Sequence, residues 1–94
     1  MLSERQIEQY LVKKVRAAGG LCYKFVSPGN SGVPDRICVF PGGRIVFAEL
    51  KAESGGRLSA LQRIQQSLLA DLGCAVYTAS SKAECDAIVA EASA

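Results

Sequence analysis

The chain has 94 residues, of which 49% are apolar and 21% are charged, and its formal net charge is +2. This length fits a single domain, residues 1–94, with a real core but marginal stability as a monomer. No apolar run approaches the ~20 residues that span a bilayer, and the N-terminus lacks the apolar core of a secretory signal. We therefore expect a soluble, cytoplasmic protein without a membrane partner, whose mild charge neither demands nor excludes DNA.

Two residue types exclude further chemistry. The chain has no histidine, which excludes Ser-His-Asp and Cys-His catalysis, His-dependent nuclease chemistry and His-ligated zinc. Its four cysteines are widely spaced and form no Cys-x-x-Cys pair, so neither a zinc ribbon nor a thioredoxin-like site is indicated. We expect them to be free thiols that are buried as small hydrophobes.

The first predicted helix covers residues 4–18. Ser3 and Gln6 have the spacing of a capping box, and a pair of glycines at 19–20 ends the helix. Glu8 borders the apolar face of this helix, where both a solvated carboxylate and a functional group remain open. The apolar positions recur at helical spacing. They are Ile7, Leu11, Val15 and Ala18.

A strand over 21–26 and a loop over 27–32 follow, because β-branched and aromatic residues give way there to Pro, Gly, Asn and Ser. Pro34 restricts its own φ and pushes the preceding residue into an extended conformation. Asp35 is therefore expected at a defined strand start. The loop is either a plain connection or a segment whose backbone N–H groups meet a phosphate backbone.

Two predicted strands, 36–40 and 45–51, are joined by a hairpin turn at 41–44. The first is apolar enough to be covered on both faces. The hairpin brings Asp35 and Glu49 to the same end of the sheet. Because side chains alternate along a strand, Glu49 and Lys51 point to the same side, continuing an apolar stripe. Such a pair is either a satisfied ion pair or part of a metal site.

A second Gly-rich loop, 52–57, leads to a helix that Ser59 caps and Gly73 ends. Gln62 has the spacing of a capping-box partner of Ser59. The helix carries one apolar stripe, which is typical of a core-facing helix. The stripe consists of Leu61, Ile64, Leu68, Leu69 and Leu72.

The chain ends with a predicted strand over 74–79 and a helix over 82–92 opened by Ser80 and Ser81. The order αβββαβα, with a hairpin and then a helix crossover into the last strand, predicts an α/β fold. Its core is a mixed four-stranded sheet flanked by helices.

Six segments, in this order, resemble the PD-(D/E)XK nuclease superfamily, and specifically its small stand-alone phage and prophage VRR-NUC members with a restriction-endonuclease-like core. Each segment is weak alone, but the ordered set is particular. The segments are Ile7-Glu8-Gln9-Tyr10-Leu11, Tyr23-Lys24-Phe25-Val26-Ser27-Pro28-Gly29, Gly32-Val33-Pro34-Asp35-Arg36, Pro41-Gly42-Gly43, Glu49-Leu50-Lys51 and Leu58-Ser59-Ala60-Leu61-Gln62.

The resemblance implies a metal-dependent DNA endonuclease. Asp35, Glu49 and the Leu50 carbonyl would bind Mg²⁺ or Mn²⁺, which prefer oxygen ligands. Glu8 would be a further metal-site residue, acting through water or directly, with Glu4 as the weaker candidate. Lys51 would orient the attacking water, since an ammonium group stabilises charge that develops on phosphate. The catalytic set implied by the resemblance also includes the second-helix glutamine, besides its open role as a helix cap. It comprises Lys51, Asp35, Glu49, Glu8 and Gln62.

The resemblance also implies a homodimer that acts on branched DNA, such as four-way junctions, in the cytoplasm of a bacterial host. A nuclease for flaps, nicks or linear DNA is an alternative, because fold does not choose among these substrates. A noncatalytic nucleic-acid-binding module with a Glu49/Lys51 ion pair is the rival from another class. The candidate DNA-binding residues are Lys24, Ser27, Gly29, Arg36 and Arg57.

Overall fold

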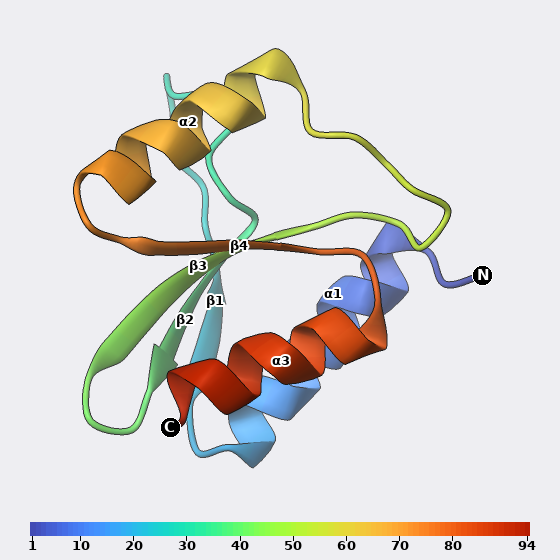
Figure 1. Ribbon diagram of the computed structural model, residues 1–94, viewed down its shortest axis with the longest axis vertical. Coiled ribbons are helices and arrows are strands. Elements are labelled where there is room, and N and C mark those ends of the chain that lie inside the picture. Colours follow the sequence, from blue (N-terminus) through green and yellow to red (C-terminus); the bar gives the residue numbers. More distant parts are fainter.

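The computed structural model describes all residues, 1–94, as three helices and one four-stranded sheet (Figure 1). Most predicted boundaries hold to within a residue. The elements in chain order are α1 (Glu4–Ala17), β1 (Leu21–Lys24), β2 (Arg36–Phe40), β3 (Arg44–Leu50), α2 (Ala60–Asp71), β4 (Ala75–Ala79) and α3 (Lys82–Ala92).

The sheet is mixed, as the element order predicts, and its strands lie in the order β1-β2-β3-β4. β1, β2 and β3 are antiparallel neighbours, whereas β4 runs parallel to β3 after the crossover through α2. In the β2–β3 hairpin Arg36 pairs with Ala48. The residues next to this pair, Asp35 and Glu49, therefore meet at one end of the sheet.

The predicted first strand is too long by two residues. β1 ends at Lys24, although the Phe25 N–H still donates to the Asp35 carbonyl at 2.8 Å. Val26 is 71% exposed, because the chain leaves the sheet there to enter the loop. The β-branched and aromatic residues at 25–26 predicted a longer strand, but these two residues have no partner strand in the sheet.

The core lies between one face of the sheet and the helices α1 and α3, which pack side by side beneath it (Figure 1). Its twelve residues come from all of these elements except β1. They are Ile7, Leu11, Val15, Cys38, Phe40, Val46, Ala48, Leu50, Ala79, Cys85, Ile88 and Ala92. All four cysteines are free; Cys38 and Cys85 are buried, and Cys22 and Cys74 are half-buried.

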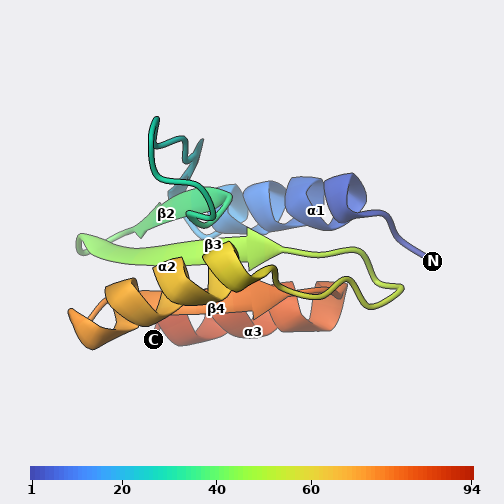
Figure 2. The same cartoon turned by 90° about the horizontal axis from the view of Figure 1, so that it is seen from above.

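The opposite face of the sheet is covered less completely. α2 lies over β4 on this face, as seen from above in Figure 2. Ile37 and Val39 of β2 are only half-buried, so the prediction that this strand is covered on both faces is wrong. No helix is both long and apolar enough to cross a membrane.

Candidate active site

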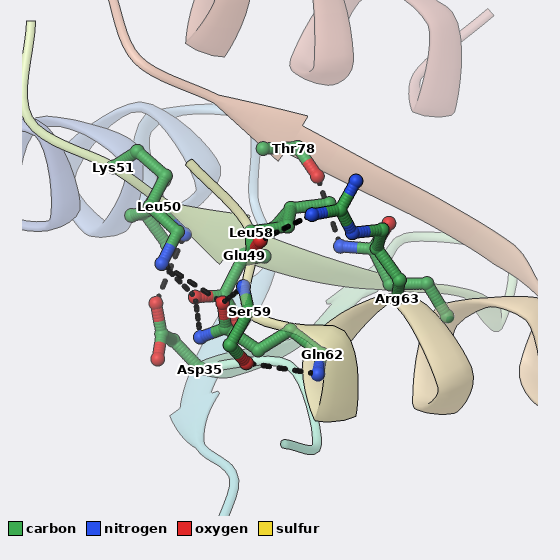
Figure 3. A network of polar contacts seen from close by, with 10 residues as sticks. Asp35, Glu49, Leu50, Lys51, Leu58, Ser59, Gln62, Arg63 and Thr78 are labelled. Atoms are coloured by element: carbon green, nitrogen blue, oxygen red, sulfur yellow. Dashed lines mark hydrogen bonds and ion pairs between the residues drawn. The ribbon is translucent and has the colours of Figure 1, made fainter. Parts of the chain in front are cut away.

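Asp35 lies directly before β2, behind the fully buried ring of Pro34. Its Oδ2 accepts a hydrogen bond from the Leu50 N–H at 2.9 Å, which ties the start of β2 to the end of β3 (Figure 3). The family resemblance implies a role for the Leu50 carbonyl, whereas this contact is made by the Leu50 amide. One carboxylate of the site is thereby held in place by the backbone.

Glu49 is the one buried charged residue, with 2% of its surface exposed. Its Oε2 accepts a hydrogen bond from Gln62 Nε2 at 2.9 Å and lies 3.6 Å from Lys51 Nζ. Its Oε1 is buried without any hydrogen-bond partner. An unpaired buried carboxylate oxygen is costly in a protein, so a positively charged group at this point would be strongly favoured.

Lys51 follows β3 directly, and its N–H donates to the Ala79 carbonyl of β4 at 2.9 Å. Its ammonium group donates to Gln62 Oε1 at 3.0 Å and faces Glu49, so the two side chains do point to the same side. The side chain of Lys51 is only 13% exposed. The ammonium group is therefore held among polar atoms at the edge of the site.

Gln62 connects the second helix to the site. Its Oε1 accepts from the Ser59 N–H at 2.8 Å, and Ser59 Oγ accepts from the Gln62 N–H at 3.1 Å. This is the predicted capping box. The same side chain also contacts Glu49 and Lys51 (Figure 3), so one residue both caps the helix and reaches the candidate site.

Gly32 was not selected from the sequence as a site residue, yet it positions Gln62. A Cβ atom at Gly32 would lie 2.5 Å from the Leu61 carbonyl carbon and 2.8 Å from the Gln62 backbone nitrogen. Its φ of +92° also lies in the region that favours glycine. A glycine three residues before Asp35 was the available signal, but only the fold shows what it touches.

Burial and, second, the negative charge of Asp35 together raise the pKa of Glu49 to about 7. Lys51 opposes this by charge and by hydrogen bonding, and Glu4 adds a small increase. Desolvation and two carboxyl groups at one point penalise the ionised form. Bringing a cation to the site would reverse this penalty.

The residues fit a hard divalent cation. Two carboxylates converge here, and Glu49 Oε1 is a buried oxygen without a partner. No cluster of three or more His, Cys, Asp or Glu side chains exists in the chain. Mg²⁺ is typically held by one or two carboxylates while water and substrate phosphate complete its shell, so two suffice for it.

Glu8 is held apart from this pair of carboxylates by an ion pair with Arg36. Arg36 Nε donates to Glu8 Oε2 at 2.7 Å, and both side chains are mostly buried. Arg36 also donates to the Cys22 carbonyl at 3.3 Å. A polar hollow of about 500 Å³ opens beside this pair, with Glu4 and Lys24 among its lining residues. The sequence did not suggest that Arg36 would be the partner of Glu8.

Among the candidate DNA-binding residues, Lys24 and Arg36 are cross-strand neighbours on β1 and β2, and the others lie in loops. Lys24 ends β1 and is exposed, and Arg57 is exposed in the loop before α2. Ser27 and Gly29 belong to a turn in which Asn30 Nδ2 donates to Ser27 Oγ at 2.9 Å. Gly29 has a φ of +83° and open space around it. Arg36, by contrast, is committed to Glu8.

No family model matches the chain. A solved structure described as a VRR_NUC domain is similar to it with a TM-score of 0.85 and 26% sequence identity, covering 96% of this chain and 97% of that one. Fold and site together therefore define a nuclease core of the VRR-NUC type, within the PD-(D/E)XK superfamily.

A relative from Acyrthosiphon pisum secondary endosymbiont phage 1, named "Putative nuclease p44", is 43% identical over 82 residues, which are 87% of each chain. This chain belongs to the VRR-NUC family of nucleases, in agreement with the resemblance found in its sequence.

Proposed function

We propose that this chain hydrolyses phosphodiester bonds of DNA in a reaction that requires Mg²⁺ or Mn²⁺. The observation that carries this proposal is the buried, unpartnered Oε1 of Glu49 next to Asp35, with Lys51 held alongside by Gln62. Asp35, Glu49 and the Leu50 carbonyl would hold the ion. When bound, it would polarise a phosphoryl oxygen and lower the pKa of a water molecule.

The side chains of the site have distinct roles in this proposal. Lys51 orients the attacking water and stabilises the charge that develops as the new phosphorus–oxygen bond forms and the ester bond breaks. Gln62 holds Lys51 by its amide oxygen and Glu49 by its amide nitrogen. Glu8 contributes through a water molecule or through Arg36. Lys24, Ser27, Gly29, Arg36 and Arg57 would contact the phosphate backbone.

We further propose branched DNA as the substrate and a homodimer as the active form. The two-fold symmetry of a dimer would place two sites on two strands of a four-way junction. Similarity to a phage protein supports a phage or prophage origin and action in the cytoplasm of a bacterial host.

The test is cleavage of matched four-way-junction, flap and linear duplex DNA in Mg²⁺, in Mn²⁺ and in EDTA. Lys51→Ala should lower the rate by about 10²–10³-fold or more, as loss of one charge-stabilising group does elsewhere. Lys82→Ala, on α3, is the matched control and should leave the rate unchanged. Preference for flap or linear DNA would replace the branched-DNA proposal, and no cleavage of any substrate would favour a noncatalytic binding module.

A further inference from the structure

Four of the five residues in the apolar stripe of α2 do not pack against their own sheet, and the fifth, Leu69, is half-buried. Leu61, Ile64 and Leu68 are each 53% exposed, and Leu72 is 83% exposed. No residue of α2 is fully buried. This exposure differs from the core-facing position that is typical of such a stripe.

A different side of α2 rests on the sheet. Its half-buried residues include Gln62, Gln65 and Gln66, and Gln66 Nε2 donates to Thr78 Oγ1 of β4 at 2.9 Å. On one flank of the helix, Ala70 borders a hollow together with Val76 of β4. The four exposed residues of the apolar stripe lie on the other flank, because they are about 120° or more around the helix from Gln66 and Ala70. They face the half of the sheet that α2 leaves open.

That open half of the sheet is also apolar. Leu21 and Tyr23 of β1 are 48% and 57% exposed, and Ile45 of β3 is 52% exposed. Figure 2 shows α2 in front of β4, whereas no helix lies in front of β2. An apolar hollow of about 610 Å³ lies at the edge of this region, with Ile45 and Phe47 in its lining. The helix stripe and the open strands therefore form one apolar surface, which we call the α2 face.

We infer that the α2 face joins two copies of this chain, and that α2 of each copy covers the open half of the other copy's sheet. A sheet in an α/β domain is normally covered by helices on both faces. Here α1 and α3 cover one face, whereas α2 alone lies on the other. The open half of the sheet lacks a covering helix with an apolar side. The α2 helix of another copy supplies one.

Symmetry and area both favour a second copy as the occupant. A two-fold interface must be self-complementary, and the α2 face offers a helix stripe and an open strand surface side by side. Seven large side chains at roughly 100 Å² each approach the ~800 Å² per partner of a standard interface. DNA is a poor match, because nucleic acid is bound chiefly through cations and these seven side chains carry no charge. The seven are Leu21, Tyr23, Ile45, Leu61, Ile64, Leu68 and Leu72.

The inference deepens the proposed homodimer by assigning its surface, and it links that surface to the active site. Leu61 belongs to the stripe, and the next residue, Gln62, holds Lys51 and Glu49. Pairing through α2 would therefore hold the helix start that positions both site residues. The two active sites of a dimer would lie at the border of the interface.

The experiment is sedimentation equilibrium of the purified chain in EDTA without DNA, at roughly 1–100 μM, a range that brackets a micromolar association. A mass of twice the 9.9 kDa chain is expected. Leu68→Glu should weaken association by about 100-fold, because it places an unpaired charge in an apolar interface. Ala70→Glu adds the same charge on the opposite flank of the same helix and should leave the mass unchanged. Circular dichroism verifies that each variant is folded.

Leu72→Glu provides a second variant if Leu68→Glu fails to fold, since Leu72 is 83% exposed and contributes little to a single copy. A monomeric mass across the whole range would overturn the inference, and capture of a different partner by that monomer would reassign the surface. A dimer that resists every stripe variant would also overturn it, because the copies would then pair elsewhere. No metal or substrate is present, so a failed nuclease assay and a failed dimer are distinguishable.

Discussion

Glu49 is buried with one carboxylate oxygen lacking a partner, and its pKa is raised to about 7 as a result. An arrangement of this kind destabilises the metal-free protein, because an ionised group is kept away from water. The same arrangement favours a cation. At the scale of single residues, the buried Glu49 therefore lowers the stability of the metal-free protein and raises its affinity for the proposed metal.

The stability of the protein should depend on pH through Glu49. A carboxyl group whose pKa is higher in the folded than in the unfolded state favours folding below its unfolded pKa, and this contribution is lost as pH rises through its folded pKa. For Glu49 the two values are 4.5 and about 7. Mg²⁺ binding needs the ionised form, so the rise in Tm caused by Mg²⁺ should be largest above about pH 8 and small below about pH 6.

Thermal unfolding in Mg²⁺ and in EDTA over this pH range measures that effect. Glu49→Gln is the control, because it cannot titrate and should show little response to Mg²⁺ at any pH. A Mg²⁺-induced rise in Tm that is the same from acid to alkaline pH would contradict the role given to this carboxylate.

Gly32→Ala should reduce cleavage without unfolding the protein. The new methyl group would lie 2.5 Å from the Leu61 carbonyl carbon, so the start of α2 must move and carry Gln62 away from Lys51. A displacement of this size near a reacting centre costs about 10-fold or more in kcat. The control is Gly42→Ala, which has a similar φ of +91° but open space around it. Equal kcat values for both variants would remove the positioning role of Gly32.

At the scale of elements, α1 and α2 begin with the same device and use it differently. Both have a serine cap with a reciprocal glutamine, Ser3 with Gln6 and Ser59 with Gln62. In α1 the glutamine contributes to the cap alone, whereas in α2 it also holds two site residues. The start of α2 is thus both a helix terminus and a wall of the site.

Ser59→Ala should lower both stability and activity, whereas Ser81→Ala should lower stability alone. Each serine caps a helix by accepting from a backbone N–H three residues on, at 3.1 Å. Loss of such a cap costs about 1 kcal/mol. Only Ser59 anchors Gln62, so only its loss should reduce kcat, as measured by cleavage and chemical unfolding side by side. Equal activity of the two variants would show that the Ser59 cap does not contribute to cleavage.

At the scale of the whole molecule, the two faces of the sheet have different tasks. The face covered by α1 and α3 holds the buried core. The opposite face holds Glu49, Lys51 and the start of α2 at one end, and exposed apolar side chains over the rest. The buried core therefore lies on one side of the sheet, and the candidate active site and the α2 face lie on the other.

Mixed dimers give a prediction at this scale. In the proposed dimer, wild-type chains combined with Lys51→Ala chains should nick one strand of a four-way junction, whereas wild-type dimers should cut both strands symmetrically. The reason is that each copy carries a complete site, so inactivating one copy silences one strand. Denaturing electrophoresis of junctions labelled on different strands distinguishes the products. Symmetric double cuts by purified mixed dimers would show that one site serves both strands.

Local pattern was sufficient to predict much of this protein. Helix caps, strand alternation and the hairpin depend on residues close in sequence, and they predicted the element order and the meeting of Asp35 with Glu49. The pairing of Glu49 with Lys51 follows from strand alternation alone. The ordered segments also indicated the family that the comparisons show.

Contacts between elements that are distant in sequence could not be predicted from local pattern and became clear only from the tertiary structure. Arg36 forms an ion pair with Glu8, which lies 28 positions earlier in the chain. Gly32 packs on the start of α2, and most of the α2 stripe stays exposed. Periodicity shows that a helix has an apolar side, but the neighbour that covers that side depends on how the elements pack. The sequence by itself thus determined the elements and the metal-binding candidates, and the packing decided which groups hold them and which surface remains free.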